Sequence, residues 1–316
     1  MASDDADLER VARRYWVDRV TMDVIAREEA VSRSTVSRML DAARSAGIVR
    51  VSVGTVHGRA AELVAALRDR FGVDAVVAPV PEGASDLARL EGVAAATGAL
   101  LGDLMGSGMV LGVAWGTTTS TVARHLDARS TVDAHVVQLN GAANTRSSGV
   151  GYAGEVIDRF GAAWGAEVHQ FPVPAFFDAV ATRRAMWRER SVRGVLAVQQ
   201  RCDIALFGVG TVAAGLPSRV YTAGYLTDAD RLSLAEERVV GDVCTVFLRA
   251  DGSWQGVPLN ARSSGPPPPA LRRIPRRLCA VAGAGKVPAL AAALAAGLVT
   301  DLVVDSGTAR TLLAHR

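Results

Sequence analysis

Lysine is almost absent from this chain. Lysine and arginine together number 35 among 316 residues, yet Lys286 is the single lysine. It follows a glycine-rich turn, in AVAGAGKVPALAAAL at residues 280–294. Because an ammonium is a compact point charge that a planar guanidinium cannot copy, this position is a candidate for ligand recognition. The alternative is a solvated surface lysine kept by chance.

Cysteine and histidine are also scarce. The three cysteines (Cys202, Cys244 and Cys279) are scattered, and none falls in a CxxC motif. This pattern excludes a disulfide framework and a cysteine zinc site, and it favours buried thiols in a reducing cytoplasm. The five histidines lie far apart without an HExxH pair, so the sequence predicts no metal site and no cofactor.

Long hydrophobic runs are missing as well. The most apolar stretch, residues 287–304, contains Pro288 and Asp301, which predicts a buried helix and a core strand and not a membrane span. The acidic, polar residues 1–16 lack the pattern of a signal peptide. With 49% apolar residues, 21% charged residues and a net charge of +3, we expect a globular, cytoplasmic protein with no membrane partner.

The chain changes character near residue 55. Residues 1–53 are rich in arginine, whereas apolar runs that end at glycine or proline alternate with helical stretches farther on. This alternation predicts an α/β fold, a Rossmann-like parallel sheet covered on both faces, with ligands at the carboxyl ends of the strands. We therefore predict two domains, 1–56 and 57–316. The expected strands lie in 75–79, 108–115, 134–141, 202–210, 277–285 and 301–307.

The first domain has the pattern of a DNA-reading helix-turn-helix. Thr21 and Ser32 are candidate N-caps of two short helices, and Ala30-Val31-Ser32 is the tight turn between them. Gly47 ends the second helix, and residues 48–53 can form a β-wing. The second helix has apolar residues at a 3.6-residue period: Val36, Met39, Leu40 and Ala43. Its other face carries the candidate DNA contacts: Ser32, Arg33, Ser34, Thr35, Ser37 and Arg38.

Local charge supports the DNA-reading interpretation. Residues 1–56 hold nine arginines and nine acids, but residues 32–50 hold four arginines and one acid, Asp41. The positive charge therefore gathers where phosphate contact requires it. The alternative is a generic three-helix cap on an enzyme.

Two glycine-rich turns of the second domain are candidate anion sites. In residues 112–126 an apolar strand passes through Gly116 into threonines at a helix start, which suits phosphate; ordinary N-capping by threonine is the alternative. AGAGK at 282–286 is no Walker A loop, because Ala280 stands where a glycine is required and Val287 follows the lysine. A lysine at a helix start is unfavourable there, and a bound anion would reverse this penalty.

Other motifs are less specific. GVGYAG at 149–154 matches GxGxxG but lacks the adjoining strand and acidic residue of a dinucleotide site, so we reject that site. PPPP at 266–269 indicates a stiff, extended connector. Asp242, expected before a hairpin strand, and Asp305, at the end of the last strand, could accept hydrogen bonds from sugar hydroxyls or act in turns and caps. No catalytic set stands out from residue spacing.

In this order, the motifs resemble the SorC family of bacterial transcriptional regulators, also called the DeoR-like sugar-binding regulators. The likeness covers nearly the whole chain. It implies a winged helix-turn-helix followed by an effector domain similar to sugar-phosphate isomerases, assembled as a homodimer or homotetramer. It rests on residues 15–53 and on GVAWGTTTSTVARHL, VVQLNGAAN, CDIALFGVGT, GDVCTVFLRADG, VPLNARSSG, AVAGAGKVPALAAAL and LVVDSGTARTLL.

The resemblance also implies an effector and a set of contacts. In that family the effector is typically a phosphorylated sugar or polyol. The family often has a second glycine where this chain has Ala142 and Ala284, so two methyl groups could narrow the pocket. By the resemblance, the phosphate contacts are Gly116, Thr117, Thr118, Gly283, Gly285 and Lys286. The rest of the pocket is lined by Asn140, Gly141, Asp242 and Asp305.

The leading hypothesis is a transcriptional regulator of a carbohydrate or polyol catabolic operon. It would be no enzyme, and its oligomer would bind a roughly palindromic operator. A sugar-phosphate isomerase-like enzyme with a helical appendage is the alternative from another class. A DNA-binding scaffold with a vestigial, empty pocket is a third possibility.

Overall fold

The protein folds as two compact units, Met1–Thr55 and Val56–Arg316. A computed structural model provides the coordinates. The structure describes residues 5–18, 20–49, 57–146, 148, 150–212, 214–216 and 218–315.

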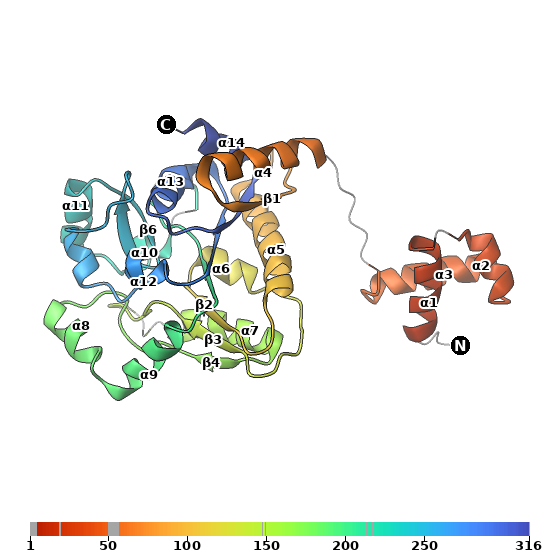
Figure 1. The fold of residues 1–316 in the computed structure, drawn as a ribbon, viewed down its shortest axis with the longest axis horizontal. Helices are drawn as coiled ribbons and strands as arrows, with labels where there is room; N and C mark the ends of the chain where they lie inside the picture. The colour runs from red at the N-terminus through yellow and green to blue at the C-terminus, as the bar shows by residue number, and fades with distance from the viewer. Residues whose placement is uncertain are drawn as a thin grey trace. The chain divides into compact units, whose positions relative to one another are not determined.

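The small unit consists of three helices around an apolar core (Figure 1). Val11, Ile25 and Val36, one from each helix, are completely buried in one cluster. Leu40 and Ala43 of the third helix are also buried, which confirms the apolar period read from the sequence. The helices are α1 (Asp5–Trp16), α2 (Met22–Glu28) and α3 (Arg33–Ser45).

A tight turn joins α2 to α3. Ala30 in this turn has a positive φ of 55°, which is uncommon for a residue with a side chain. Ser32 caps α3 as predicted, because its hydroxyl accepts a hydrogen bond of 3.1 Å from the Thr35 N–H. Thr21 does precede α2, but its side chain makes no capping hydrogen bond. Most of the predicted wing at 48–53 lies outside the described residues.

The large unit is built on a seven-stranded sheet in the order β1-β9-β8-β5-β2-β3-β4. Every pair in this sheet is parallel, so the predicted α/β class with a parallel sheet is confirmed. A separate antiparallel hairpin joins β6 (Val239–Val243) to β7 (Val246–Arg249). The strands of the large sheet are β1 (Asp74–Ala78), β2 (Val110–Val113), β3 (His135–Gln138), β4 (Glu167–His169), β5 (Ile204–Phe207), β8 (Arg276–Val281) and β9 (Asp301–Asp305).

Helices connect the strands and cover the sheet (Figure 1). Among the described residues, no helix combines the length and the apolar character that a membrane span requires. The helices are α4 (His57–Phe71), α5 (Asp86–Leu104), α6 (Thr117–Val122), α7 (Glu155–Trp164), α8 (Val180–Met186), α9 (Arg190–Gln199), α10 (Arg219–Thr222), α11 (Asp228–Glu236), α12 (Pro268–Leu271), α13 (Val287–Ala295) and α14 (Ser306–Ala314).

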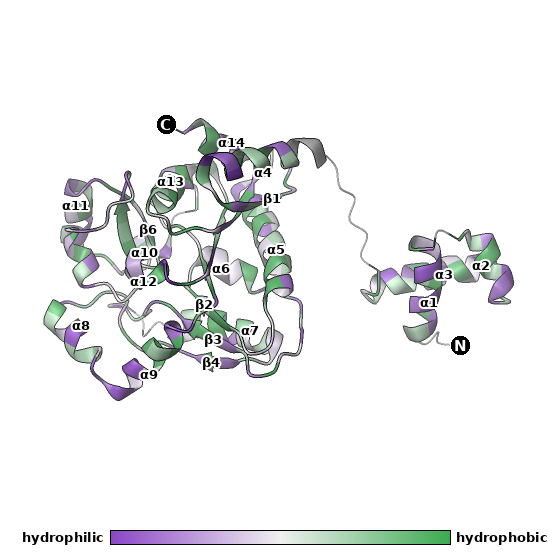
Figure 2. Ribbon diagram, in the orientation of Figure 1, coloured by the Kyte–Doolittle hydropathy of each residue, from purple (hydrophilic) through white to green (hydrophobic). Residues whose placement is uncertain are grey.

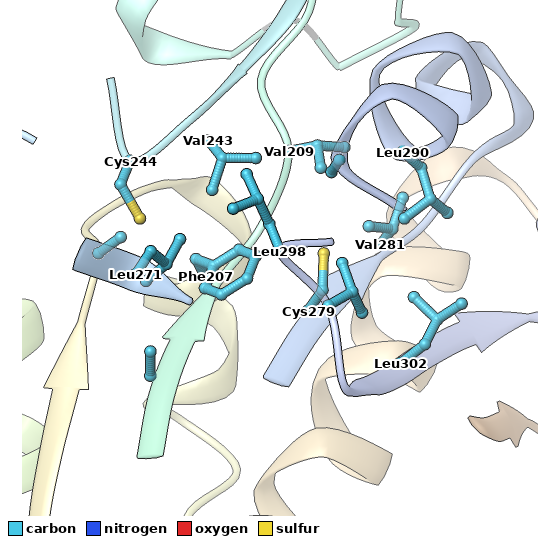
Figure 3. Close-up of a cluster of buried hydrophobic side chains, with 14 of the residues drawn as sticks. Phe207, Val209, Val243, Cys244, Leu271, Cys279, Val281, Leu290, Leu298 and Leu302 are labelled. Atoms are coloured by element: carbon cyan, nitrogen blue, oxygen red, sulfur yellow. The ribbon is translucent and has the colours of Figure 1, made fainter. Parts of the chain in front are cut away.

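Hydrophobic residues are frequent in the strands of the sheet (Figure 2), and apolar clusters cover both of its faces, as continuously hydrophobic strands require. Strand β8 shows the alternation, because successive side chains point to opposite faces. Leu278 and Ala280 pack in the cluster that includes residues of α5, α6 and α7. Cys279 and Val281 pack in the cluster with α4, α13 and α14, which Figure 3 shows around Phe207. The predicted burial of the cysteine thiols is confirmed.

The structure corrects several local predictions. Strand β4 has no counterpart among the expected strands, because it has three residues and two of them are polar. The proline run does not stay extended: α12 begins at Pro268, since the first turn of a helix needs no N–H from proline. Asp242 precedes the hairpin strand β7 as expected, and it is itself part of the other hairpin strand, β6. Val150–Gly154 of the rejected dinucleotide motif forms a π-helical turn that leads into α7.

The strand order reverses direction between β2 and β5. After β2 the chain builds outward through β3 to β4 at one edge of the sheet. It then returns to place β5 on the other side of β2 and builds outward through β8 and β9. Such a switch point leaves a crevice at the carboxyl ends of the two central strands, where ligands of open α/β sheets bind.

Substitution of Phe207 tests how much the stability of the large unit depends on the apolar core shown in Figure 3. Its ring is fully buried at the end of the central strand β5. We expect Phe207→Ala to lower the free energy of unfolding of the large unit by about 3–5 kcal/mol, because apolar burial is lost and a cavity remains. Urea denaturation followed by circular dichroism measures this loss. The control Val132→Ala removes methyl groups from a side chain that is 74% exposed, and it should change the free energy by less than about 0.5 kcal/mol.

Candidate functional site

A pocket lies at the switch point of the sheet. Its walls come from the segments that follow β2, β3, β5 and β8, and α5 and the β6–β7 hairpin complete it. Eight of the ten predicted effector contacts line it: Gly116, Thr117, Thr118, Asn140, Asp242, Gly283, Gly285 and Lys286. Residues up to 200 positions apart in the chain, Asp86 and Lys286, therefore meet where the topology favours a ligand.

The segment after β2 brings the start of α6 to the pocket. Gly116 is the N-cap of α6 and has no side chain to occupy the first N–H groups of the helix. The threonine hydroxyls do not cap either, since Thr119 donates to the Gly116 carbonyl and Thr121 to the Thr117 carbonyl. The N-capping alternative is therefore wrong for these threonines. The helix start therefore lines the pocket without a side-chain cap on its backbone donors.

The segment after β8 brings the single lysine to the same pocket. Lys286 is the N-cap residue of α13, and only 8% of it is exposed. Its ammonium forms no hydrogen bond or ion pair with the described residues, so the surface-lysine alternative is wrong. Burial lowers the pKa of Lys286, while the carboxyls of Asp242 and Asp86 act in the opposite direction. These carboxyls offset the charge of the ammonium only in part and form no ion pair with it, so a bound anion near this helix start would stabilise it further.

Asp242 faces the pocket from the hairpin. Its Oδ2 accepts a hydrogen bond of 3.1 Å from the Thr245 N–H, while its Oδ1 is buried without a partner. Burial raises the pKa of Asp242 to about 6, although the hydrogen bonds from Thr245 and Tyr221 and the charge of Lys286 act in the opposite direction. A Cβ on Gly210 would lie 2.0 Å from Asp242 Oδ1, so only glycine lets this carboxyl approach β5 so closely.

Asn140 and Gly141 are neighbours with different roles, one in the pocket lining and one in the shape of the turn. Asn140 lines the pocket, and its Oδ1 is buried without a hydrogen-bond partner. Gly141 does not line the pocket, contrary to expectation. It shapes the turn through its backbone: its N–H donates to Ser264 Oγ at 2.9 Å, and its carbonyl accepts from Trp115 Nε1 at 2.9 Å. A Cβ here would lie 2.3 Å from the Val173 carbonyl, so the position requires glycine.

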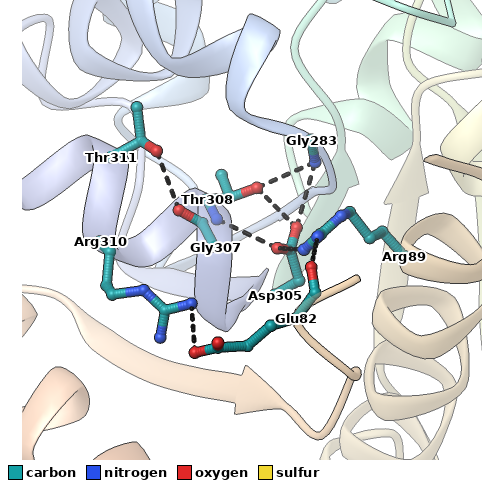
Figure 4. A network of polar contacts seen from close by, with 8 residues as sticks. All are labelled: Glu82, Arg89, Gly283, Asp305, Gly307, Thr308, Arg310 and Thr311. Carbon is teal, nitrogen blue, oxygen red and sulfur yellow. Dashed lines mark hydrogen bonds and ion pairs between the residues drawn. The ribbon is translucent and has the colours of Figure 1, made fainter. Parts of the chain in front are cut away.

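Asp305 also lies outside the pocket lining, in a polar network behind it (Figure 4). Its carboxylate accepts hydrogen bonds from the Thr308 N–H at 3.0 Å, from the Gly283 N–H at 3.1 Å and from Arg89 at 2.8 Å. Burial raises its pKa, but the hydrogen bonds from Thr308, Gly283 and Arg89 outweigh burial and hold the pKa of Asp305 below its usual value. The capping role that the sequence left open is therefore the one observed.

Some pocket residues have no sequence motif. Asp86, at the start of α5, and Trp115, directly after β2, both line the pocket. Trp115 stacks on Tyr225 with ring centroids 5.0 Å apart. Its position at the carboxyl end of a strand is the signal that could have identified it. Neither Ala142 nor Ala284 lines the pocket, so the expected narrowing by their methyl groups is not observed.

The candidate DNA contacts lie along the first turns of α3 in the small unit. Arg33, Ser34, Ser37 and Arg38 are exposed, Thr35 is partly buried, and Ser32 is the N-cap. Arg33 pairs with Asp23 at 3.6 Å. The Arg38 guanidinium donates to Thr35 Oγ1 at 3.3 Å, which leaves further donors on an exposed side chain.

Comparison with known proteins identifies the family. A family model, Sugar-bind, described as "Putative sugar-binding domain", matches residues 57–314. The chain belongs to the SorC family of sugar-binding transcriptional regulators. The resemblance of the sequence motifs to the SorC family is thereby confirmed.

Relatives within the SorC family match along most of their length. The deoxyribonucleoside regulator of Bacillus subtilis is 28% identical over 96% of this chain and 95% of its own length. A crystallised "domain of a possible sugar-binding transcriptional regulator" from Arthrobacter aurescens is 46% identical, with a TM-score of 0.76, over 82% of this chain and 100% of that domain. The full-length sorbitol operon regulator SorC of Klebsiella pneumoniae has the same fold, with a TM-score of 0.82 at 24% identity over 98% of this chain and 99% of SorC.

The buried carboxyl of Asp242 gives a pH-dependent prediction for this SorC-family protein. Because its folded pKa of about 6 exceeds the unfolded value of 3.8, its ionisation costs stability as the pH rises through this window. We compare the unfolding free energy of Asp242→Asn with that of the wild type at each pH. This difference should be about 2 kcal/mol more favourable to the variant at pH 7.5 than at pH 4.0. Urea denaturation at both pH values measures the change.

Asp178→Asn, which removes an exposed carboxylate elsewhere in the unit, is the control. An equal difference between Asp242→Asn and the wild type at pH 4.0 and pH 7.5 would contradict the raised pKa of Asp242.

Proposed function

We propose that this protein regulates transcription of a carbohydrate or polyol catabolic operon in response to a phosphorylated sugar or polyol. One observation carries the proposal. The pocket combines a buried, unpaired ammonium on Lys286, an uncapped helix start at Gly116, and two buried acceptor oxygens on Asn140 and Asp242.

The positive part of this pocket fits a phosphate. Backbone N–H groups at the start of α6 and the Lys286 ammonium come from separate strand ends yet line one pocket. A phosphate between them would accept hydrogen bonds from both and would offset the burial of the ammonium. Thr117 and Thr118 supply hydroxyl donors on the same turn. Gly283 and Gly285 let the backbone approach closely.

The polar acceptors of the pocket fit the hydroxyls of a sugar or polyol. Asn140 Oδ1 and Asp242 Oδ1 are buried without partners, and such groups are costly unless a hydrogen-bond donor reaches them. Hydroxyl groups are suitable donors for both. Trp115 adds an apolar ring to the same lining, as sites for small polar ligands often require.

The small unit is proposed to bind DNA through a helix-turn-helix formed by α2 and α3. The exposed start of α3 presents Arg33, Ser34, Ser37 and Arg38, which have the size and chemistry to contact base edges and phosphates in a major groove. In a cytoplasmic homodimer or homotetramer, paired copies of α3 would match a roughly palindromic operator. Effector binding would change operator affinity if the two conformational states differ in their affinity for the effector.

A second function rests on Asp242. A buried carboxyl whose pKa is raised to about 6, close to a lysine, is a property of acid–base catalysts as well as of binding sites. A sugar-phosphate isomerase would use such a group. The named relatives are transcriptional regulators, which favours the regulator, and turnover of pentose and hexose phosphates by the purified protein is the test of the enzyme.

Lys286→Met tests the phosphate site. Fluorescence anisotropy on DNA from upstream of the protein's own gene should show binding that a pool of sugar and polyol phosphates alters. In Lys286→Met the response to that pool should weaken by at least about 10-fold, because a charge-assisted hydrogen bond is lost, while DNA binding without the pool is unchanged.

The matched control uses the same sugars and polyols without phosphate. They should act weakly and equally on the wild type and on Lys286→Met. If Lys286→Met responded to the phosphorylated pool as strongly as the wild type does, the ammonium would not hold the phosphate.

Arg38→Ala tests the reading helix. We expect operator affinity to fall by about 10-fold, with a smaller salt dependence if Arg38 contacts phosphate, and with effector binding retained. Anisotropy at several salt concentrations measures both effects. Arg13→Ala, which removes an exposed arginine from α1, is the control and should bind operator nearly as the wild type does. Equal affinity in Arg38→Ala and Arg13→Ala would place the DNA contacts elsewhere.

A further inference from the structure

A cluster of metal-ligating side chains lies on the large sheet outside the pocket. His135 is the first residue of β3, and Glu167 and His169 belong to the edge strand β4. Their ligand atoms all lie within 4.8 Å of one another. The sequence predicts no metal site, because His135 and His169 are 34 residues apart and share no local motif.

Strand pairing explains how these residues meet. His135 lies directly opposite Glu167, and Val137 lies opposite His169. Residues opposite each other, and residues two apart on one strand, point to the same face of a sheet. The three side chains therefore share one face, and the backbone of two paired strands fixes their positions.

The distances fit a tetrahedral metal ion. His135 Nδ1 and His169 Nε2 are 3.0 Å apart. A Glu167 oxygen lies 3.6 Å from His135 Nδ1, and the other lies 3.7 Å from His169 Nε2. Zinc bonds of about 2.0–2.1 Å in tetrahedral geometry separate two ligand atoms by about 3.3 Å. A small separation of the two nitrogens and a rotation of the exposed Glu167 side chain, which would bring one oxygen near both, would place all three donors around one ion.

We propose that His135, Glu167 and His169 bind a divalent transition-metal ion of the zinc type. Two imidazoles and one carboxylate are a donor set that suits Zn²⁺, and a water molecule would complete four-coordination. Without metal, the two facing nitrogens share one proton in a hydrogen bond. Metal binding requires the donating imidazole to carry its proton on the other ring nitrogen, so that each facing nitrogen gives its lone pair to the ion.

The surroundings supply further support. The second nitrogen of His135, Nε2, lies 3.6 Å from Asp133 Oδ1, so a small movement of the exposed Asp133 would form the hydrogen bond by which carboxylates orient metal-bound imidazoles. Arg201 also acts electrostatically on His169. Arg201 is the positive charge that opposes a cation here.

The ion would fasten the edge of the sheet. Strand β4 pairs with β3 over three residue positions, a short pairing for an edge strand. A metal held by side chains of both strands adds a cross-link that the backbone does not supply. Its effect is on the stability of this edge, and it does not depend on the pocket or on the proposed effector.

Zinc binding to the full-length protein, with any affinity tag removed, tests the proposal. Equilibrium dialysis against ZnCl₂ should give saturable binding of one ion per chain, and the midpoint temperature of unfolding should rise with added zinc. Bound Co²⁺ should show the intense visible absorption of a tetrahedral site. An absence of saturable zinc binding to the wild type would overturn the proposal.

Variants identify the ligands. Glu167→Gln and His169→Gln should each weaken zinc binding by about 100-fold or more, as the loss of a metal ligand requires. The Glu167 side chain is 68% exposed, so Glu167→Gln can change the fold little, and far-ultraviolet circular dichroism checks His169→Gln. The control His315→Gln, in a histidine outside the cluster, should bind zinc as the wild type does. Unchanged affinity in both ligand variants would also overturn the proposal.

Discussion

The buried carboxylate of Asp305 joins three parts of the large unit that are distant in the sequence. It caps α14, accepts the Gly283 N–H of the loop after β8, and pairs with Arg89 of α5. Its side chain is completely excluded from solvent, a position that a carboxylate tolerates only when hydrogen bonds and a counter-charge replace water. The glycine-rich loop is therefore fixed from behind. This support lets the loop present Lys286 to the pocket without a partner for the ammonium.

The pocket itself is left electrostatically incomplete. Native proteins normally pair buried polar groups, and each unpaired one costs stability. Here a nearly buried ammonium and two unpartnered oxygens, on Asn140 and Asp242, line one cavity. The charges of Lys286 and Asp242 offset each other only in part, because the pKa of each is still shifted toward its neutral form. A ligand with an anionic group and hydroxyl donors would satisfy all three groups together.

Much of the fold could be predicted from the sequence, because long apolar runs and helical periods are local signals. Such local signals predict the strands with continuous apolar residues, and they also predict α3 with its Ser32 cap. The sequence does not predict strand β4, because three residues with two polar side chains are too short to show a hydrophobic periodicity. Asp305 shows a different limit. An aspartate at a strand end can face a ligand or cap the next helix, and only the three-dimensional position of Thr308 and Gly283 decides between them.

The same limit applies more strongly to His135 and His169. A motif such as HExxH is visible because one helix brings both ligands together, whereas two paired strands do so at any separation along the chain. A ligand at the switch point would act in a comparable way, because Gly116 follows β2 and Lys286 follows β8, on opposite sides of the reversal in strand order. A phosphate that bridges them would connect the two halves of the sheet. Since only a state in which both sets of donors reach the phosphate gains this energy, the effector would favour that state over any more open one.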